Sequence, residues 1–238
     1  MSAGGSIGMI LDRALSPELL DVALRVATEH DGDPDARQLL SVALRDYVTP
    51  QEAANKTKKI LTRVWVAPPV PAQPMIRWAI KNQDECPDRR ALHLGALLAT
   101  FPFVGSIAAA VGRQLHLERC VEPRAVRGFA RATFGEREFV DAGAMKTLAT
   151  MRNLGLLKGL KGAPYAVGVQ PIAPAPFASW FLHALILTRQ VESVGIDELS
   201  RANELATLKL EPEASDYPLL EMHSENGRTV AAVRNGGK

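Results

Sequence analysis

The sequence predicts a mainly α-helical protein that ends in a small β-hairpin. Apolar residues recur at three- and four-residue spacing along much of the chain, as they do on the buried side of a helix. Asn226-Gly227 lies between two short apolar runs and is a strong signal for a two-residue hairpin turn. With 238 residues, 47% of them hydrophobic, the chain can bury a substantial core in one or two domains.

The N-terminal part of the chain predicts a bundle of three helices. Ser16 is a typical N-cap with Pro17 at the first helical position, and an apolar stripe follows to about Thr28. A second helix is expected at about 35–46. The third follows Thr49, and its outer side carries the basic residues Lys56, Lys58, Lys59 and Arg63.

A proline-rich stretch, residues 66–74, cannot continue a helix and is expected to be stiff and extended. A spacer this short either separates two domains or turns a corner inside one. We place the division just beyond it, with residues 1–82 as an N-terminal helical domain. Residues 83–238 then form a winged-helix-containing domain, in which a helix at about 177–192 is apolar nearly all round and should be buried.

Ala91 to Val111 is a run of 21 residues without a formal charge, which is long enough to span a bilayer. Pro102 in its middle favours two buried helices instead, at about 89–100 and 103–117. The first nine residues lack the basic start of a secretory signal, and the two cysteines form no disulfide framework. We therefore expect a cytoplasmic protein with no membrane partner, and anchoring through the uncharged run is the rival hypothesis.

Residues 121–169 have the pattern of a winged helix-turn-helix. Pro123 opens an amphipathic helix to Phe134, Gly135 allows a turn, and a second helix is expected at about 137–153. A glycine-rich basic turn and a β-prone return follow, as in the wing of such domains. Within this motif, the order of helix, turn, helix and hairpin is typical of small domains that reach into a DNA groove. The complete fold prediction is a helical N-terminal bundle, this winged helix-turn-helix region and the C-terminal hairpin.

The second helix of this motif has two expected sides. Four apolar residues are expected to pack inward: Val140, Ala144, Leu148 and Met151. The opposite side is then expected to face a major groove: Gly143, Lys146, Thr147, Thr150 and Asn153. Lysine and asparagine read base edges, and threonine hydroxyls reach bases or phosphates.

Cations near this helix are expected to contact phosphate oxygens. They are Arg124, Arg127 and Arg131 on one face of the first helix, Arg137 at the turn, and Lys158 and Lys161 on the wing. Lys58 and Lys59 would extend this surface from the N-terminal domain, or form the solvated face of a bundle helix. The outer stripe has no arginine for guanine, which favours non-specific backbone binding over sequence-specific recognition.

The charges lie in blocks although the formal net charge is only +2. Residues 101–170 hold ten Lys/Arg against five Asp/Glu, whereas residues 191–223 hold two against eight. An anionic partner should therefore meet the middle of the chain. The acidic C-terminal block faces a basic protein or is simply solvated.

Catalytic and metal-binding patterns are missing from the sequence. The five histidines are scattered without metal-ligand spacing, and no phosphate-binding glycine loop or nucleophile elbow is present. We expect no enzymatic activity, no cofactor and no metal. The leading hypothesis is a non-enzymatic protein that binds double-stranded DNA, and the alternative is a protein-interaction module in a multi-component complex, with the oligomeric state left open.

The segment Ala144-Met-Lys-Thr-Leu-Ala-Thr-Met-Arg-Asn-Leu-Gly-Leu-Leu157 resembles the closing helix and Leu-Gly-Leu exit of the BrxA-like family of BREX phage-defence systems. The helices that end near Trp65 and the apolar pair within 91–111 fit the same outline. The resemblance covers most of the chain in outline. It implies a small DNA-binding component that works beside larger antiviral defence proteins, without a cofactor.

Overall fold

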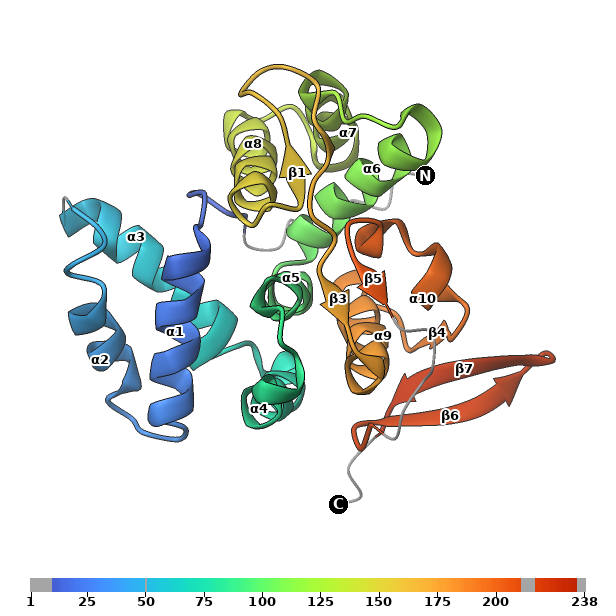
Figure 1. Ribbon diagram of the computed structural model, residues 1–238, viewed down its shortest axis with the longest axis horizontal. Helices are drawn as coiled ribbons and strands as arrows, with labels where there is room; N and C mark the ends of the chain where they lie inside the picture. Colours follow the sequence, from blue (N-terminus) through green and yellow to red (C-terminus); the bar gives the residue numbers. More distant parts are fainter. Residues whose placement is uncertain (1–9, 50, 211–216, 235–238) are drawn as a thin grey trace.

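The computed structural model describes residues 10–49, 51–210 and 217–234, and it is mainly helical with small two- and three-stranded sheets (Figure 1). The predicted mainly helical character and the small C-terminal hairpin are confirmed. The remaining positions, including the uncharged start of the chain, lie outside the described residues.

The N-terminal helices are α1 (Pro17–Glu29), α2 (Ala36–Ala43) and α3 (Gln51–Leu61), close to the predicted ranges. Ser16 caps α1, because its side chain accepts a hydrogen bond from the Leu19 N–H. The chain then continues from α3 through a wider π-helical turn, Thr62–Val66.

The proline-rich stretch turns a corner and is only partly extended. A 3-10 turn spans Val70–Ala72, and α4 (Gln73–Lys81) starts at once with Pro74 in its first turn. The expectation of an extended spacer is wrong here. A backbone N–H in the first turn of a helix has no partner within that helix, so proline, which lacks this N–H, fits there without loss of a hydrogen bond. The Trp180 indole N–H donates to the Met75 carbonyl at 3.0 Å, which ties α4 to a helix of the C-terminal half.

Three helices form the centre of the molecule: α5 (Arg89–Thr100), α6 (Pro102–Glu118) and α9 (Ala175–Arg189). Their bounds match the predictions within a few residues. Gly95 of α5 gives α9 room for a close approach, since a Cβ atom there would lie 2.0 Å from the Trp180 ring. Every residue of α5 from Ala91 to Thr100 is buried.

Within the described ranges, no single helix is both long and apolar enough to cross a membrane. α5 and α6 pass that test only when they are taken together across a bend of 119°.

The middle of the chain continues with α7 (Pro123–Phe134), α8 (Glu138–Asn153), β1 (Leu157–Lys158) and β2 (Ala166–Val167). β1 and β2 pair antiparallel. In Figure 1 these elements form the upper part of the molecule, beside the upper end of α6.

The C-terminal strands form two further sheets. β3 (Ile172–Ala173) pairs parallel with β5 (Lys209–Leu210). β4 (Ser193–Gly195), β6 (Leu220–Glu225) and β7 (Arg228–Val233) form one antiparallel sheet in the order β4-β7-β6, and a short helix, α10 (Glu198–Arg201), lies between β4 and β5 in the chain. Asn226 and Gly227 both have positive φ, as the predicted two-residue turn requires.

A single cluster of buried apolar residues crosses the expected domain division at residue 82. It includes Leu20 and Trp65 from the N-terminal part and Trp180 and Phe181 from α9. The two predicted domains therefore share one core.

Candidate nucleic-acid interface

The candidate interface is built by α7, α8 and the β1–β2 pair, which follow α6 in the chain. Val121, two residues before the start of α7, forms a two-bond bridge with Tyr165, directly before β2. Val126 and Ala130 of α7 and Val140 and Ala144 of α8 are fully buried, so periodic apolar residues hold the two helices together. The four predicted inward residues of α8 are all buried.

The three arginines of α7 differ in their surroundings. Arg124 is exposed, and Arg127 is half-buried with an Nε atom that has no partner among the described residues. Arg131 forms a two-pronged ion pair with Asp141 of α8, with 2.7 Å between Nε and Oδ1. The hydrogen bonds from Arg131 lower the pKa of the Asp141 carboxyl. The expectation of three free cations on one face is therefore wrong for Arg131, because a carboxylate already binds its guanidinium.

The expected groove-facing side of α8 is wrong for three of its five residues. Gly143, Thr147 and Thr150 are buried, because the segment before α1 and the Phe103 ring pack on this side. Thr147 donates to the Gly143 carbonyl, so its hydroxyl stays within the helix. A Cβ atom on Gly143 would lie 2.0 Å from the Ile10 side chain.

The segment before α1, residues 10–16, is hydrogen-bonded to α8. The Leu15 N–H donates to the Thr150 hydroxyl at 3.0 Å, and the Asn153 side-chain amide donates to the Leu15 carbonyl at 2.9 Å. Sequence reasoning missed this contact. Its only local signal is that Ile10, Leu11 and Leu15 are apolar although they precede the helix cap.

The side of α8 that does face outward carries Phe139, Ala142, Lys146 and Asn153. Lys146 and Asn153 therefore lie at the surface as predicted, although the Asn153 amide is already bonded to Leu15. Arg137 at the start of α8 is also exposed, and its guanidinium lies 5.8 Å from the centre of the Phe139 ring.

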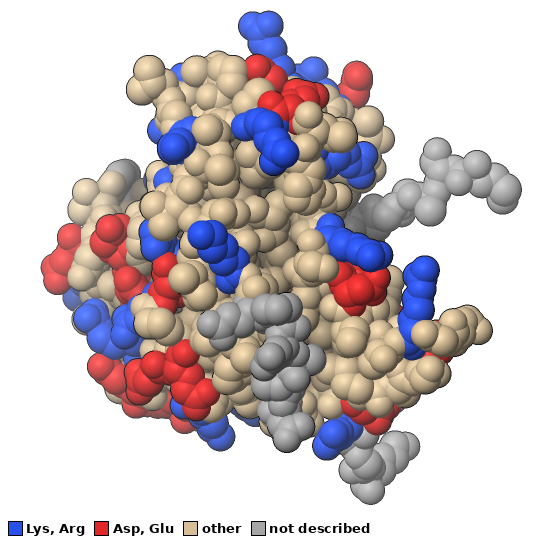
Figure 2. All heavy atoms as spheres, turned by 45° about the vertical axis from the view of Figure 1, so that its right-hand side comes forward, with Lys and Arg blue, Asp and Glu red and all other residues tan. Residues whose placement is uncertain are grey.

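The turn between β1 and β2 presents two lysines. Lys158 and Lys161 are exposed and flank Leu160, which is 80% exposed. At the base of the turn, the Arg152 guanidinium lies 5.2 Å from the centre of the Tyr165 ring. Figure 2 shows separate Lys and Arg groups over the upper part of the molecule with Asp and Glu side chains among them, so the cations form no continuous patch on that face.

Lys58 and Lys59 lie on α3, which packs against α1, α2 and the π-helical turn. Lys59 is exposed and Lys58 is half-buried. In Figure 1, α3 belongs to the N-terminal bundle and stands apart from the β1–β2 turn. These two lysines therefore belong to a surface other than that of the α7–α8 cations.

In the described part of the chain, no group of three or more His, Cys, Asp or Glu residues has the arrangement of a metal site. No protein-family model, curated protein or solved structure matches this chain.

Proposed function

We propose that this protein is a non-enzymatic double-stranded DNA-binding protein whose α6–β2 region acts as a winged helix-turn-helix. The observation that supports this proposal is the order of its elements. A helix (α6), a bridging residue (Val121), two helices (α7 and α8) and a two-stranded turn follow one another, and Val121 pairs with the returning strand at Tyr165. A winged domain orders its elements in this way when its second helix enters a groove and its turn contacts the backbone.

The proposed phosphate contacts are the exposed cations of this region that have no ion pair among the described residues. Arg124 and Arg137 lie at the start of α7 and α8, and Lys158 and Lys161 lie on the wing. Lys146 occupies the outward side of α8, where a groove would be. Three residues that the sequence assigned to the interface are not proposed as contacts. Arg131 is paired with Asp141, and Thr147 and Thr150 are buried.

Few side chains on the outward side of α8 are able to read bases. Phe139 and Ala142 have no polar side-chain atom, and the Asn153 amide is bonded to Leu15. Sequence readout needs donors and acceptors at base edges, whereas phosphate contacts need only charge. We therefore assign to this protein a binding mode with little sequence preference.

A salt titration tests this proposal. We expect the combined change Arg124→Ala, Lys158→Ala and Lys161→Ala to weaken binding to every duplex by about an order of magnitude at low salt, because phosphate contacts supply the affinity. The slope of log affinity against log salt should fall by about 0.9 for each phosphate that the variant no longer neutralises. Fluorescence anisotropy with a labelled random duplex at several salt concentrations measures both quantities.

The matched control replaces three exposed cations far along the chain from the interface, Arg25, Lys81 and Lys209, with alanine. It removes the same charge but should leave the salt slope unchanged. Equal slopes in the two triple variants, or no binding of the unchanged protein at low salt, would refute the proposal.

A protein-docking role for the same surface is the second candidate. It is favoured by Phe139 and Leu160, which are 50% and 80% exposed between the cations. From the resemblance alone, we also propose a setting among phage-defence proteins. Absence of a DNA shift, together with co-purifying defence proteins, would select docking over DNA binding.

A further inference from the structure

The C-terminal sheet has an open edge strand. β6 pairs only with β7 in the described sheet, whose order is β4-β7-β6. Glu225 and Arg228 flank the two-residue turn and therefore exchange both backbone hydrogen bonds. Because this pattern alternates along the strand, the backbone N–H and C=O groups of Met222 and Ser224 point away from β7. Among the described residues, no backbone group pairs with them.

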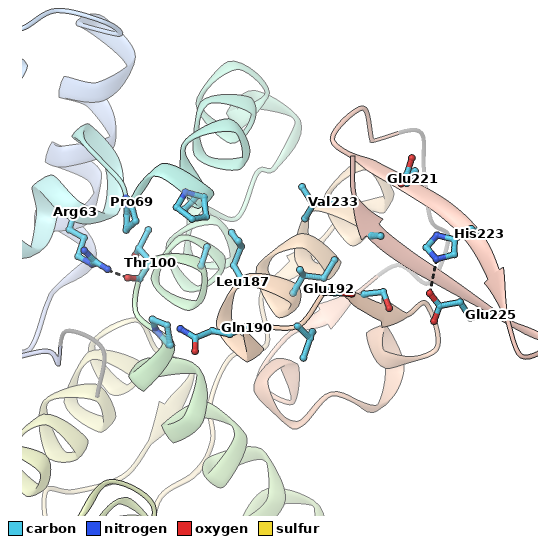
Figure 3. A pocket seen from close by; sticks show the side chains of 18 residues that line it. Arg63, Pro69, Thr100, Leu187, Gln190, Glu192, Glu221, His223, Glu225 and Val233 are labelled. Atoms are coloured by element: carbon cyan, nitrogen blue, oxygen red, sulfur yellow. Dashed lines mark hydrogen bonds and ion pairs between the residues drawn. The ribbon is translucent and has the colours of Figure 1, made fainter. Parts of the chain in front are cut away.

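One face of the same strand borders a hollow of about 970 Å³. The hollow lies between the β4-β7-β6 sheet, the end of α9 and the corner where α5 meets α6 (Figure 3). Alternate side chains of β6, those of Glu221, His223 and Glu225, line it because they share one face of the strand. Leu187 and Val233 add an apolar part to its lining.

The hollow is acidic. Among the described residues that line it, three are glutamates (192, 221 and 225) and one, Arg63, is a cation. The Arg63 Nε donates to the Thr100 carbonyl at 2.9 Å, and the guanidinium lies 5.3 Å from the centre of the Phe101 ring, so one positive charge stands against three carboxylates. Glu225 contacts His223 at 2.7 Å, whereas Glu192 and Glu221 have no ion pair in the described structure.

We propose that an extended basic segment of a partner protein adds a strand to the edge of β6. Its backbone would pair with Met222 and Ser224, as in other cases of strand addition. Its alternate side chains would face Glu221, His223 and Glu225, so Lys or Arg at every second position fits this face. This surface lies on the C-terminal sheet and is separate from the proposed DNA interface.

The glutamates also argue against a second copy of the chain as the occupant. Two β6 edges that pair with each other would place carboxylates opposite or diagonal to carboxylates, which destabilises the pair. Acidic residues on an edge strand protect it against self-association. They do not oppose a partner of the opposite charge.

Binding of a designed peptide tests the proposal. The probe is a short fluorescein-labelled peptide that alternates lysine with valine, and a peptide that alternates glutamate with valine is its control. We expect the first to bind the full chain in fluorescence anisotropy and the second not to bind. The double change Glu221→Lys and Glu225→Lys should weaken binding about tenfold or more, because two attractive cross-strand pairs become repulsive.

Two further variants separate the contributions of charge and backbone. The double change Glu29→Lys and Glu85→Lys alters the same charge at exposed positions elsewhere and should leave the affinity unchanged. Met222→Pro removes an outward N–H but no bond to β7, so it should weaken peptide binding and leave the melting curve nearly as it was.

Three outcomes of the peptide experiments would overturn the proposal. They are no binding of the lysine peptide, equal loss of affinity in the two charge variants, and unaltered binding by Met222→Pro in a folded protein. A dimer that is seen by light scattering and dissociates on Glu221→Lys would also overturn it, by making a second copy the occupant.

Discussion

At the scale of single residues, carboxylates and backbone groups decide which polar side chains are available to a partner. Arg131 is paired with Asp141, and Asn153 is bonded to Leu15, although both lie at the surface. Lys146, Lys158 and Lys161 are exposed and have no ion pair within the described ranges. The cations of the proposed interface are therefore those that are exposed and have no partner within the described ranges, and residue type alone does not identify them.

A buried histidine makes stability depend on pH. Burial lowers the pKa of His183 to about 4, and its Nδ1 lies 3.1 Å from the Tyr217 hydroxyl. The pKa in the unfolded chain is about 6.5, so the unfolded state binds more protons between these two values. Stability should therefore fall as the pH is lowered from about 6.5 to about 4, by roughly 3 kcal/mol.

Urea unfolding at several pH values measures this loss, and His183→Gln supplies the comparison. The variant should lose the part of the pH dependence that His183 contributes. His93 keeps part of it, since burial also lowers its pKa despite its contact with Asp21. An unchanged pH dependence in His183→Gln would show that His183 does not control it.

At the scale of elements, the segment before α1 acts as a cover for one side of α8. Ile10 packs at Gly143, and Leu15 exchanges hydrogen bonds with Thr150 and Asn153. Through these contacts the N-terminal bundle and the proposed DNA-binding helix are held in one arrangement.

Loss of one of these hydrogen bonds should release the segment. Asn153→Ala removes the donor to the Leu15 carbonyl and is expected to cost about 1 kcal/mol locally. Trypsin cleavage after Arg13 should become about fivefold faster, because the open population of the segment rises. Limited digestion followed by mass spectrometry gives the rate. The control variant Lys146→Ala, changed on the outward side of the same helix, should be cleaved at the original rate. A similar acceleration of cleavage in this control would contradict the role of Asn153.

At the scale of the whole molecule, the shared core predicts one unfolding transition. Buried side chains from both predicted domains belong to the same apolar cluster, and the indole of Trp180 is bonded across the division to Met75. We expect far-UV circular dichroism and tryptophan fluorescence to give the same midpoint in urea. Two separated transitions would instead support the predicted division at residue 82.

Local signals predicted most of the fold and little of the site. Pro17, Pro102 and Pro123 each mark a helix start in the structure, and Asn226-Gly227 marks the hairpin turn. The burial of the second side of α8, at Gly143, depends instead on contact with Ile10, which is more than 100 residues away in the chain. Periodicity describes one helix at a time, so it shows neither that contact nor the ion pair between α7 and α8.

The position of α9 also matters while the chain is being synthesised. The α5–α6 pair, which contains the uncharged run from Ala91 to Val111, leaves the ribosome well before α9, the helix that packs on α5. At about 5–20 residues per second, the nascent chain presents this bare apolar surface for on the order of ten seconds. We expect a holding chaperone to be able to bind this surface during that interval, until α9 covers it.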